Sequence, residues 1–234
     1  MLKIEQLNVG YGDIQVLWDI NLDIQAGEVV ALIGSNGAGK STLLWTLSGL
    51  LKPLSGSIHF EGEDLAGAPP DRIVSLGLTQ VPQGRRLFAG LTVKENLLQG
   101  AYSRSDKAGI AEDLDLVLTL FPRMKERLNQ AAGSMSGGEQ QMCAVGRGLM
   151  ARPKLLMVDE VSLGLAPIVV EAIYEAIGKV RARGMTVLIV EQDVQAALEQ
   201  ADRGYVLDVG HLIMSGAAAD LLANPKIREA YLGI

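Results

Sequence analysis

The sequence is poor in cysteine and in long apolar runs, and both shortages exclude classes of protein. Cys143 is the only cysteine among 234 residues, so no internal disulfide can form, which fits a reducing compartment such as the cytoplasm. The longest apolar runs, such as 187–190, have the length of a strand, whereas a membrane-spanning helix needs about 20 residues. Residues 1–12 have the pattern of a strand and not of a signal peptide. We expect a chain that is soluble alone and reaches a membrane only through partner proteins.

The chain also lacks an excess of basic residues. Its formal net charge is −6 and its pI is near 5.0, whereas a domain that binds nucleic acid through phosphates is usually basic, so no nucleic-acid partner is predicted. Apolar material is plentiful: 48% of the residues are hydrophobic, which is enough for a large buried core. A length of 234 residues suits one α/β domain, or a core domain with an inserted lobe.

Short β-branched runs alternate with longer helical patterns, which predicts an α/β fold with a mostly parallel sheet and helices on its faces. Buried strands are expected at residues 29–33, 155–158 and 186–190. Between the last two, apolar residues recur at helical spacing from 169 to 180. Residues 85–152 differ, because they show three helical patterns and contain no convincing strand. We predict that they form a helical lobe inserted into the α/β core.

Two of the three helices in this lobe have clear start signals. Thr92 and Glu95 have the spacing of a capping box, in which each residue satisfies a backbone N–H group of the other. Ser136 and Glu139 have the same spacing. Between these two helices, an apolar stripe at 110–121 predicts the remaining one.

A glycine-rich motif at residues 34–41 carries the clearest chemistry. Its pattern G-x-x-x-x-G-K-[ST] lies between an expected buried strand and an apolar helix, the setting of a phosphate-binding loop. Glycines let consecutive backbone N–H groups point at phosphate oxygens, and the start of the helix adds a positive end. Lys40 is expected to reach the β- and γ-phosphates, and Ser41 to bind Mg²⁺. The predicted nucleotide-binding residues here are Gly34, Ser35, Asn36, Gly37, Ala38, Gly39, Lys40, Ser41 and Thr42.

Two acidic residues follow the second expected strand. Asp159 is placed to hold Mg²⁺ through its water shell, and Glu160 to orient or deprotonate an attacking water. Alone, this pattern would be better explained by two solvated acids at a strand end. Its occurrence together with a phosphate-binding loop favours the second half of one nucleotide site. Lys40 and Glu160 are then the catalytic candidates.

A serine followed by two glycines opens the third helix of the lobe. The capping box of Ser136 and Glu139 explains part of this pattern, but a cap does not require Gly137 and Gly138. A serine and free backbone N–H groups at a helix start also bind anions. Two anion sites and a single nucleotide motif in one chain suggest that the chain works as half of a dimer.

Over essentially its whole length, the chain resembles the ATP-binding subunits of ABC transporters. Residues 34–41 match the Walker A motif of that family, and residues 155–159 match the Walker B motif. Glu160 falls at the position of the catalytic glutamate. Residues 136–140 match the signature motif, preceded by Met135 where leucine is usual. The resemblance implies a P-loop NTPase fold and an ATPase activity coupled to transport across a membrane.

The resemblance also implies how the chain is organised and what it assembles with. Residues 1–84 and 153–234 would form a catalytic core that includes an antiparallel β subdomain, and residues 85–152 a helical subdomain, within one nucleotide-binding domain. The implied partners are permease subunits, a second ATPase subunit (a sister subunit or a second copy) and, indirectly, a solute-binding protein. The implied location is the cytoplasmic face of the cell membrane.

The family pattern adds two residues to the predicted site. Gln83 falls at the Q-loop position, where it would join Ser41 and Asp159 as a ligand of Mg²⁺. Tyr11 falls where the family stacks an aromatic ring on adenine, although a surface tyrosine at a strand end is the simpler interpretation of Tyr11 alone. In this family two subunits pack head to tail, so that residues 136–138 of one subunit would close on the ATP of its partner.

Within the family, several stretches look like the ATP-binding subunit of branched-chain amino acid transporters, of the LivF type. They cover residues 81–88, 91–97, 162–167, 190–192 and 230–233. There are three alternatives. The chain could be an ATPase subunit for another polar solute such as urea, an ABC ATPase without a transport role, or a module that binds ATP without hydrolysing it. One P-loop, a short helical lobe and a full set of catalytic candidates favour the transporter ATPase.

Two positions depart from the usual family pattern. Most ABC ATPases carry a histidine after the strand at 186–190, whereas this chain has Gln192, which can donate a hydrogen bond to the γ-phosphate but cannot titrate near neutrality. The resemblance therefore makes Gln192 a third catalytic candidate. Val161 stands where proline usually follows the catalytic glutamate, and it leaves free the φ angle that proline would fix.

Gln192→Ala is expected to slow ATP turnover by about 10- to 100-fold without removing ATP binding, because a lost hydrogen bond to a charged group costs about 1.5–3 kcal/mol. Gln192→His should be tolerated better, because histidine restores a donor of similar reach, and it should add an ionisation to the pH–rate profile. Steady-state phosphate release at several pH values around neutrality measures both effects. Turnover of the alanine variant within about twofold of wild type would place Gln192 outside the site.

Overall fold

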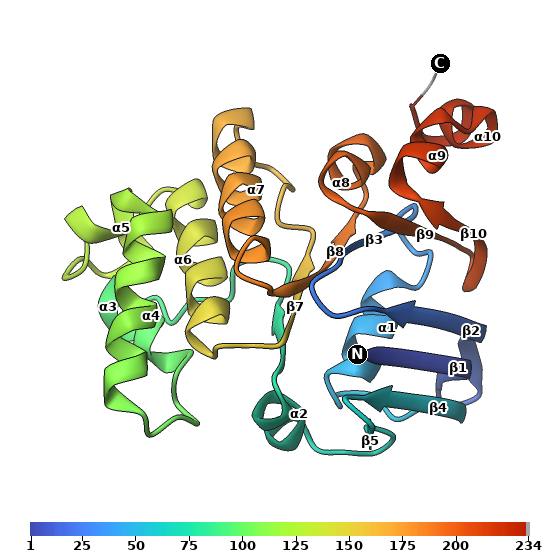
Figure 1. Ribbon diagram of the computed structural model, residues 1–234, viewed down its shortest axis with the longest axis horizontal. Coiled ribbons are helices and arrows are strands. Elements are labelled where there is room, and N and C mark those ends of the chain that lie inside the picture. The colour runs from blue at the N-terminus through green and yellow to red at the C-terminus, as the bar shows by residue number, and fades with distance from the viewer. Residues whose placement is uncertain (233–234) are drawn as a thin grey trace.

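The apolar runs of the sequence form two β-sheets in the computed structural model, which describes residues 1–232 (Figure 1). Within these residues the larger sheet has six strands, in the order β10, β9, β3, β8, β7 and β6. Their bounds are β3 Val29–Ile33, β6 Leu78–Val81, β7 Leu155–Asp159, β8 Thr186–Glu191, β9 Arg203–Asp208 and β10 His211–Ala217. Neighbouring strands pair in parallel except β9 and β10. The predicted mostly parallel sheet is confirmed.

The smaller sheet is antiparallel, as the family resemblance implied. Its strands lie in the order β2, β1, β4 and β5. Their bounds are β1 Leu2–Tyr11, β2 Ile14–Ile24, β4 Ser55–Phe60 and β5 Glu63–Asp64. Figure 1 shows this sheet at the N-terminal end of the chain, next to β10 of the larger sheet.

Helices accompany both sheets and form a separate group between β6 and β7. Those beside the sheets are α1 Lys40–Leu47, α2 Pro70–Leu76, α7 Pro167–Arg181, α8 Val194–Gln200, α9 Ala218–Ala223, α10 Pro225–Ile227 and the π-helix η2 Arg228–Leu232. The group between β6 and β7 contains α3 Val93–Gln99, α4 Lys107–Leu120, α5 Pro122–Glu126, the 3₁₀-helix η1 Ala132–Ser134 and α6 Gly137–Met150. Gly233, the last residue of the predicted subfamily stretch at 230–233, lies outside the described residues.

Strand β3 shows how the larger sheet is buried on both faces. Val29, Ala31 and Ile33 belong to an apolar cluster that includes side chains of α6, α7 and α8. Val30 and Leu32 belong to a second cluster, formed with α1 and the smaller sheet. A strand with two buried faces must be apolar throughout, which is why it appears in the sequence as a continuous run and not as an alternating one.

Strands β7 and β8 each extend one residue beyond their predicted bounds. Asp159 pairs with Val190 in the ladder of β7 and β8, and Glu191 pairs with Ile33 in the ladder of β3 and β8. The apolar pattern did not reveal these residues because the ladder continues into polar ones. The carboxyl ends of β3, β7 and β8 therefore meet at one edge of the sheet, where open α/β sheets bind their ligands.

Residues 85–152 contain helices and no strand, as predicted. An isolated antiparallel bridge joins Thr92 to Ala131. Both predicted capping boxes are present, because Thr92 and Ser136 each exchange both hydrogen bonds with the glutamate three residues later. Figure 1 shows these helices gathered on the side of the molecule away from the smaller sheet. Their assignment as a subdomain with boundaries at 85 and 152 stays a prediction.

The only cysteine of the chain lies in the buried side of this helical group. Cys143 on α6 has no exposed surface, and burial raises the pKa of its thiol to about 11.

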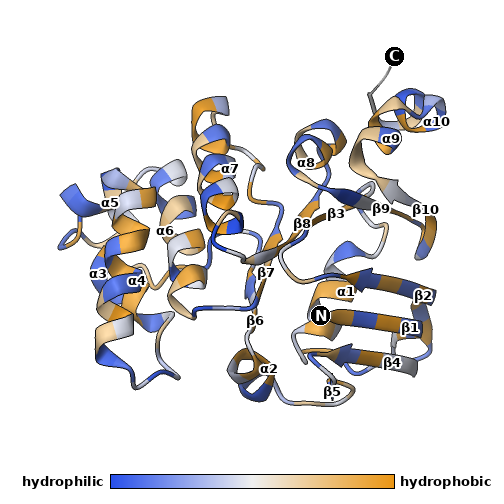
Figure 2. Cartoon of the chain, viewed as in Figure 1, coloured by the Kyte–Doolittle hydropathy of each residue, from blue (hydrophilic) through white to orange (hydrophobic). Residues whose placement is uncertain are grey.

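Figure 2 shows hydrophobic and hydrophilic residues interspersed along α4 and α7, as expected for helices with one buried face. None of the helices in residues 1–232 combines the length and the apolar character needed to cross a bilayer.

The turn between β9 and β10 connects the smaller sheet to the loop that follows β3. The N–H of Gly210 donates to the carbonyl oxygen of Ala38 at 2.9 Å, and its own carbonyl accepts from the N–H of Trp18 at 3.0 Å. Gly210 has a φ of 78°, and a Cβ atom added to it would lie 2.0 Å from the carbonyl oxygen of Val16. Only glycine fits this position without strain.

Gly210→Ala is expected to lower the free energy of unfolding by about 2–4 kcal/mol, because a left-handed backbone and a steric clash both oppose the added methyl group. The matched control is Gly216→Ala on β10, where an added Cβ meets nothing within 4 Å. Its effect should stay within about 0.5 kcal/mol. Urea unfolding followed by circular dichroism measures both, and equal stability of the two variants would contradict the prediction.

Candidate functional site

The predicted phosphate loop connects β3 to α1, and the surrounding packing requires its glycines. Gly37 and Gly39 have φ angles of 81° and 110°, a left-handed conformation that favours glycine. A Cβ atom on Gly34 would lie 2.2 Å from the carbonyl oxygen of Leu207, and one on Gly39 would lie 2.6 Å from Leu17. The loop therefore has a backbone shape that larger residues cannot adopt, and it lies at the start of a helix. This geometry suits a bound phosphate.

Lys40, the first residue of α1, is buried and points back into the loop. Its side chain is 5% exposed, and its Nζ atom donates to the carbonyl oxygens of Gly34 at 2.8 Å and Ser35 at 3.1 Å. The same ammonium group lies 3.3 Å from the carboxylate of Glu160. The positive charge of Lys40 is thus held against the backbone of the phosphate loop, beside the carboxylate of Glu160.

Glu160 directly follows β7 and is held from three sides. Its N–H donates to the carbonyl oxygen of Val190 at 2.8 Å. One side-chain oxygen accepts a hydrogen bond of 2.7 Å from Nε2 of Gln83, and the other pairs with Lys40. Its φ of 45° is left-handed, which is uncommon for a residue with a side chain and is typical of functional sites.

Asp159 is the buried member of the acidic pair. Its side chain is 4% exposed, and burial raises its pKa to about 6, with the neighbouring Glu160 charge adding to the rise. Two adjacent carboxylates and one lysine leave this corner with an excess of negative charge, so a bound cation would be favourable. No group of three His, Cys, Asp or Glu residues that could hold a metal occurs in residues 1–232. The residues fit Mg²⁺, which takes few protein ligands and completes its shell with water and phosphate oxygens.

A cavity of about 200 Å³ joins these elements at the carboxyl edge of the sheet. It is lined by Val16, Asn36, Gly37, Gly39, Lys40, Ser41, Thr42, Gln83 and Glu160. The structure thus brings together residues from the loop, from the segment after β6 and from the end of β7. These are the three parts that the sequence placed in one nucleotide site.

Tyr11 lies at the end of β1, beside the phosphate loop. Its hydroxyl group makes a hydrogen bond of 3.3 Å with Oγ1 of Thr42, and its ring meets Trp45 edge to face at 6.5 Å. The residue is 42% exposed, so part of it is accessible. This position is compatible with stacking on adenine, which stays a prediction.

Two predicted parts of the site lie elsewhere. Ser136, Gly137 and Gly138 cap and open α6 and do not line the cavity, and the hydroxyl of Ser136 donates to Glu139 at 2.8 Å. Gln192 is an exposed residue directly after β8 and does not line the cavity either. The roles of all four residues therefore stay predictions.

Two residues near the site were not predicted. Val16 on β2 lines the cavity, and no motif marks it. Glu191 ends β8 as a buried acid that accepts hydrogen bonds from Ser162. A signal for Glu191 was present, because an acid directly after an apolar run is the same pattern that drew attention to Asp159.

A glycine-rich phosphate loop after one parallel strand, and two carboxylates at the end of another strand of the same sheet, are the arrangement of P-loop proteins that bind and hydrolyse nucleotides. The chain has this fold and this site. The family model described as "ABC transporter" matches residues 17–162, more than half of the chain. The chain therefore belongs to the ABC transporter family, as one of its ATP-binding subunits with an ATPase activity coupled to transport.

Individual proteins of the family agree with this assignment. The chain is 52% identical over 233 residues to the "High-affinity branched-chain amino acid transport ATP-binding protein BraG" of Pseudomonas aeruginosa, which covers 100% of both chains. Its structure is similar to an ATP-binding cassette of an ABC transporter in the ADP conformation, with a TM-score of 0.87 and 28% identity over 100% of this chain and 99% of the other. A dimeric cassette in a post-hydrolysis state, bound to ADP and Pi, matches with a TM-score of 0.79 and 26% identity over 93% and 99%.

Glu160→Gln is expected to reduce ATP turnover by at least about 100-fold while ATP still binds, because the amide keeps the shape of the side chain but cannot accept a proton. Glu171→Gln, at an exposed position on α7, is the matched control and should leave turnover unchanged. Phosphate release and the binding of a fluorescent ATP analogue measure the two quantities. Turnover of Glu160→Gln above about a tenth of the wild-type rate would show that another group is the base.

Proposed function

We propose that this chain is the ATP-hydrolysing subunit of an ABC importer for branched-chain amino acids. The observation that carries this proposal is the 52% identity, over the full length of both chains, with a branched-chain amino acid transport ATP-binding protein. In the family, the solute is recognised by other subunits. The proposal that the solute is a branched-chain amino acid is therefore supported by this likeness as a whole and not by any one residue. Residues 1–84 and 153–234 are the proposed catalytic core, and residues 85–152 the helical subdomain.

ATP is proposed to bind with its phosphates in the loop after β3 and its adenine against Tyr11. The backbone N–H groups of the loop and the start of α1 would attract the phosphates. Lys40 would reach the β- and γ-phosphates from the position that it holds beside Glu160. The partial exposure of Tyr11 and its hydrogen bond to Thr42 support an adenine position next to the loop.

Ser41, Gln83 and Asp159 are the proposed ligands of Mg²⁺. Ser41 and Gln83 line the same cavity, and the buried carboxylate of Asp159 accepts a hydrogen bond from the backbone of Gln83, with a pKa raised to about 6 by burial. When bound, Mg²⁺ neutralises charge on the phosphates of the nucleotide. Oxygen ligands of this kind suit a hard cation that keeps part of its water shell.

Glu160 is the proposed general base, and its neighbours fix how its carboxylate points. Gln83 donates to one oxygen and Lys40 contacts the other, so the group has little freedom to rotate. Glu160 would accept the proton of the water that attacks the γ-phosphorus, and ADP would leave as the P–O bond breaks. Gln192 would donate a hydrogen bond to the γ-phosphate from the loop after β8.

Two copies or two related subunits are proposed to pack head to tail. The signature residues 136–138 do not line the cavity that holds the phosphate loop, although a serine and free N–H groups at a helix start suit an anion. A head-to-tail dimer would bring these residues to the ATP of the partner subunit. The dimeric state of the similar cassette bound to ADP and Pi supports this arrangement.

Permease subunits are proposed to dock between β6 and the helical group. A cavity of about 440 Å³ lies there, and its lining includes Pro82, Arg86, Phe88 and Tyr102. The side chain of Phe88 is 54% exposed and that of Tyr102 is 87% exposed, so neither aromatic ring packs in the core. Rings exposed around a cavity are typical of a protein interface.

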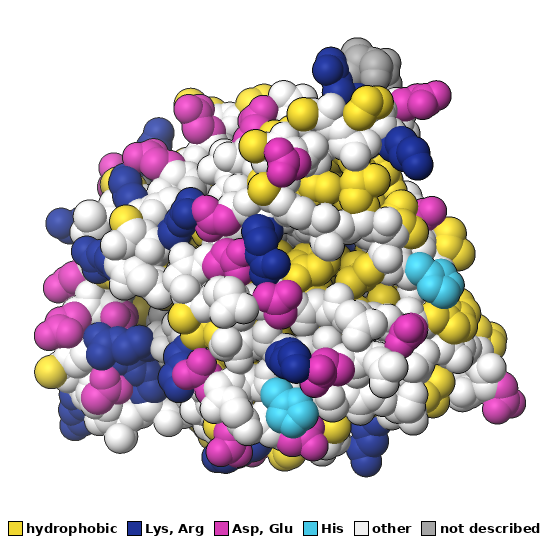
Figure 3. All heavy atoms as spheres, turned by 45° about the vertical axis from the view of Figure 1, so that its right-hand side comes forward, with side chains coloured by type: hydrophobic (Ala, Val, Ile, Leu, Met, Phe, Trp, Pro, Cys, Tyr) yellow, Lys and Arg dark blue, Asp and Glu magenta, His cyan; other side chains and the backbone are white. Residues whose placement is uncertain are grey.

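The face of the molecule in Figure 3 gives no support to a nucleic-acid partner. Lysine and arginine side chains are interspersed there with aspartate and glutamate, without an extended basic area. Attachment to the inner face of the cell membrane through permease subunits is proposed from the likeness to transporter ATP-binding subunits.

Reconstitution of the chain with its permease subunits in liposomes tests the proposed function. With ATP inside the liposomes and the solute-binding protein outside, leucine uptake is expected, and Glu160→Gln should abolish it. Urea is the comparison solute, because a urea transporter is the alternative within the family. Uptake of urea without leucine would overturn the proposed solute. ATP hydrolysis without any solute uptake would overturn the transport role.

Arg86→Glu is expected to weaken binding of the permease by at least about tenfold, because it reverses a charge in the lining of the docking cavity. Arg85 is less suited to this test, because its guanidinium group lies against Gly137 of the signature, within 2.8 Å of where a Cβ atom would be. Arg123→Glu, at a 67% exposed position on α5, is the matched control. Co-purification and ATP binding are measured, and unchanged co-purification of Arg86→Glu would contradict this placement.

A further inference from the structure

The last residue of β8 is a buried carboxylate that the proposed ATP chemistry does not use. Glu191 is 1% exposed and accepts three hydrogen bonds. Ser162 donates two of them, from its N–H at 3.1 Å and from its Oγ at 2.9 Å. Tyr174 donates the third from its hydroxyl group at 3.5 Å. The charged neighbours that act on Glu191 are acidic, Glu160 and Asp193.

A carboxylate in this position is costly. Burial raises the pKa of Glu191, and no lysine or arginine among the described residues offsets the charge. An apolar residue would continue β8 at less cost, since the other residues of the strand are also fully buried. The hydrogen bonds from Ser162 are the interactions that an apolar residue could not make.

The end of β8 holds both ends of the turn that carries Glu160. At the start of the turn, the N–H of Glu160 donates to the carbonyl oxygen of Val190 at 2.8 Å. At its end, Ser162 donates to the carboxylate of Glu191. Between them, Val161 is buried at 1% exposed but leaves φ free, unlike a proline. The left-handed φ of Glu160 is thus maintained by contacts on each side of it.

We propose that Glu191 is a positioning residue, which fixes the turn at 160–162 through Ser162 and so holds the carboxylate of Glu160 in its place for ATP hydrolysis. This inference rests on the proposed role of Glu160 as the base. Glu191 itself does not line the cavity around Lys40. Its effect therefore passes through the backbone from Ser162 to Glu160.

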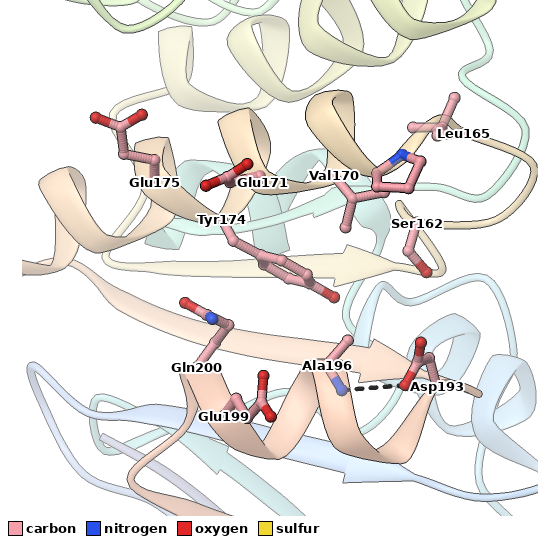
Figure 4. Close-up of a pocket in the computed structure, with 11 residues that line it drawn as sticks. Ser162, Leu165, Val170, Glu171, Tyr174, Glu175, Asp193, Ala196, Glu199 and Gln200 are labelled. Carbon is pink, nitrogen blue, oxygen red and sulfur yellow. Dashed lines mark hydrogen bonds between the residues drawn. The ribbon is translucent and has the colours of Figure 1, made fainter.

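Tyr174 offers a way to separate this role from simple packing. Figure 4 shows Ser162 and Tyr174 at the same cavity, which has a volume of about 700 Å³ and lies between α7 and α8. Both side chains donate to Glu191, but only Ser162 belongs to the turn at 160–162. Loss of the Tyr174 hydroxyl removes a donor from the carboxylate and leaves the turn attached.

Glu191→Ala is expected to lower kcat by about 10- to 100-fold, because small displacements of a catalytic group cost this much. The KM for ATP and the affinity for a non-hydrolysable analogue should change by less than about threefold, because the phosphate loop is unaffected. Glu191→Gln, which keeps an acceptor for the N–H of Ser162, should lie between Ala and wild type. Tyr174→Phe is the matched control and should keep kcat near the wild-type value.

Ser162→Ala completes a double-mutant cycle with Glu191→Ala. If Glu191 acts through Ser162, the two losses in kcat should not multiply, because the second change removes an interaction already lost. Losses that multiply would overturn the proposal, and so would a wild-type kcat in Glu191→Ala or an equal loss in Tyr174→Phe. If Glu191→Ala fails to fold, Glu191→Gln replaces it in the comparison, and its kcat should lie below those of wild type and Tyr174→Phe.

Amide exchange at Ser162 separates this inference from the proposed function. Glu191→Ala should speed exchange of the Ser162 N–H whether or not Glu160 is the base, because the hydrogen bond that protects it is gone. Faster exchange with unchanged kcat would overturn the positioning role. Retained turnover in Glu160→Gln would instead overturn the proposed base, and with it the inference that depends on the base.

Discussion

The parallel pairing of β3, β7 and β8 is the constraint on which the whole site depends. Ile33 lies opposite Glu191 and Asp159 lies opposite Val190, so the three strands end at nearly the same level. The phosphate loop, the acidic pair and the loop after β8 therefore start side by side. A slip of one residue would turn every side chain of a strand to the other face, and both apolar clusters resist such a slip.

Three locally unfavourable features lie at this edge. Glu160 has a left-handed backbone, while Asp159 and Glu191 are buried acids whose pKa values are raised by burial. Such features persist where the surrounding structure determines them, and here the sheet is covered by apolar clusters on both faces. The stability of the sheet away from the site offsets the cost of arranging charges within it.

Much of the fold follows from local signals in the sequence. Continuous apolar runs marked the central strands, and the capping boxes at Thr92 and Ser136 marked two helix starts, because these patterns involve residues close in sequence. The hydrogen bond between Gln83 and Glu160 joins residues 77 positions apart, and no local pattern encodes it. For the same reason, the sequence did not show that Arg85 lies against Gly137 while Arg86 lines the cavity between β6 and the helical group.

The burial of Cys143 has a practical consequence for following how two subunits approach each other. Its thiol has no exposed surface and a pKa of about 11, so at neutral pH it remains protonated and out of reach of alkylating reagents. A cysteine introduced at the surface would then be the one reactive thiol of the chain. Spin labels or fluorescent dyes can be attached at chosen positions, for instance near the start of α6 and on β1, with the native sequence otherwise intact. Distances between such probes would test whether the proposed dimer forms, and whether it closes and opens during each cycle of ATP hydrolysis.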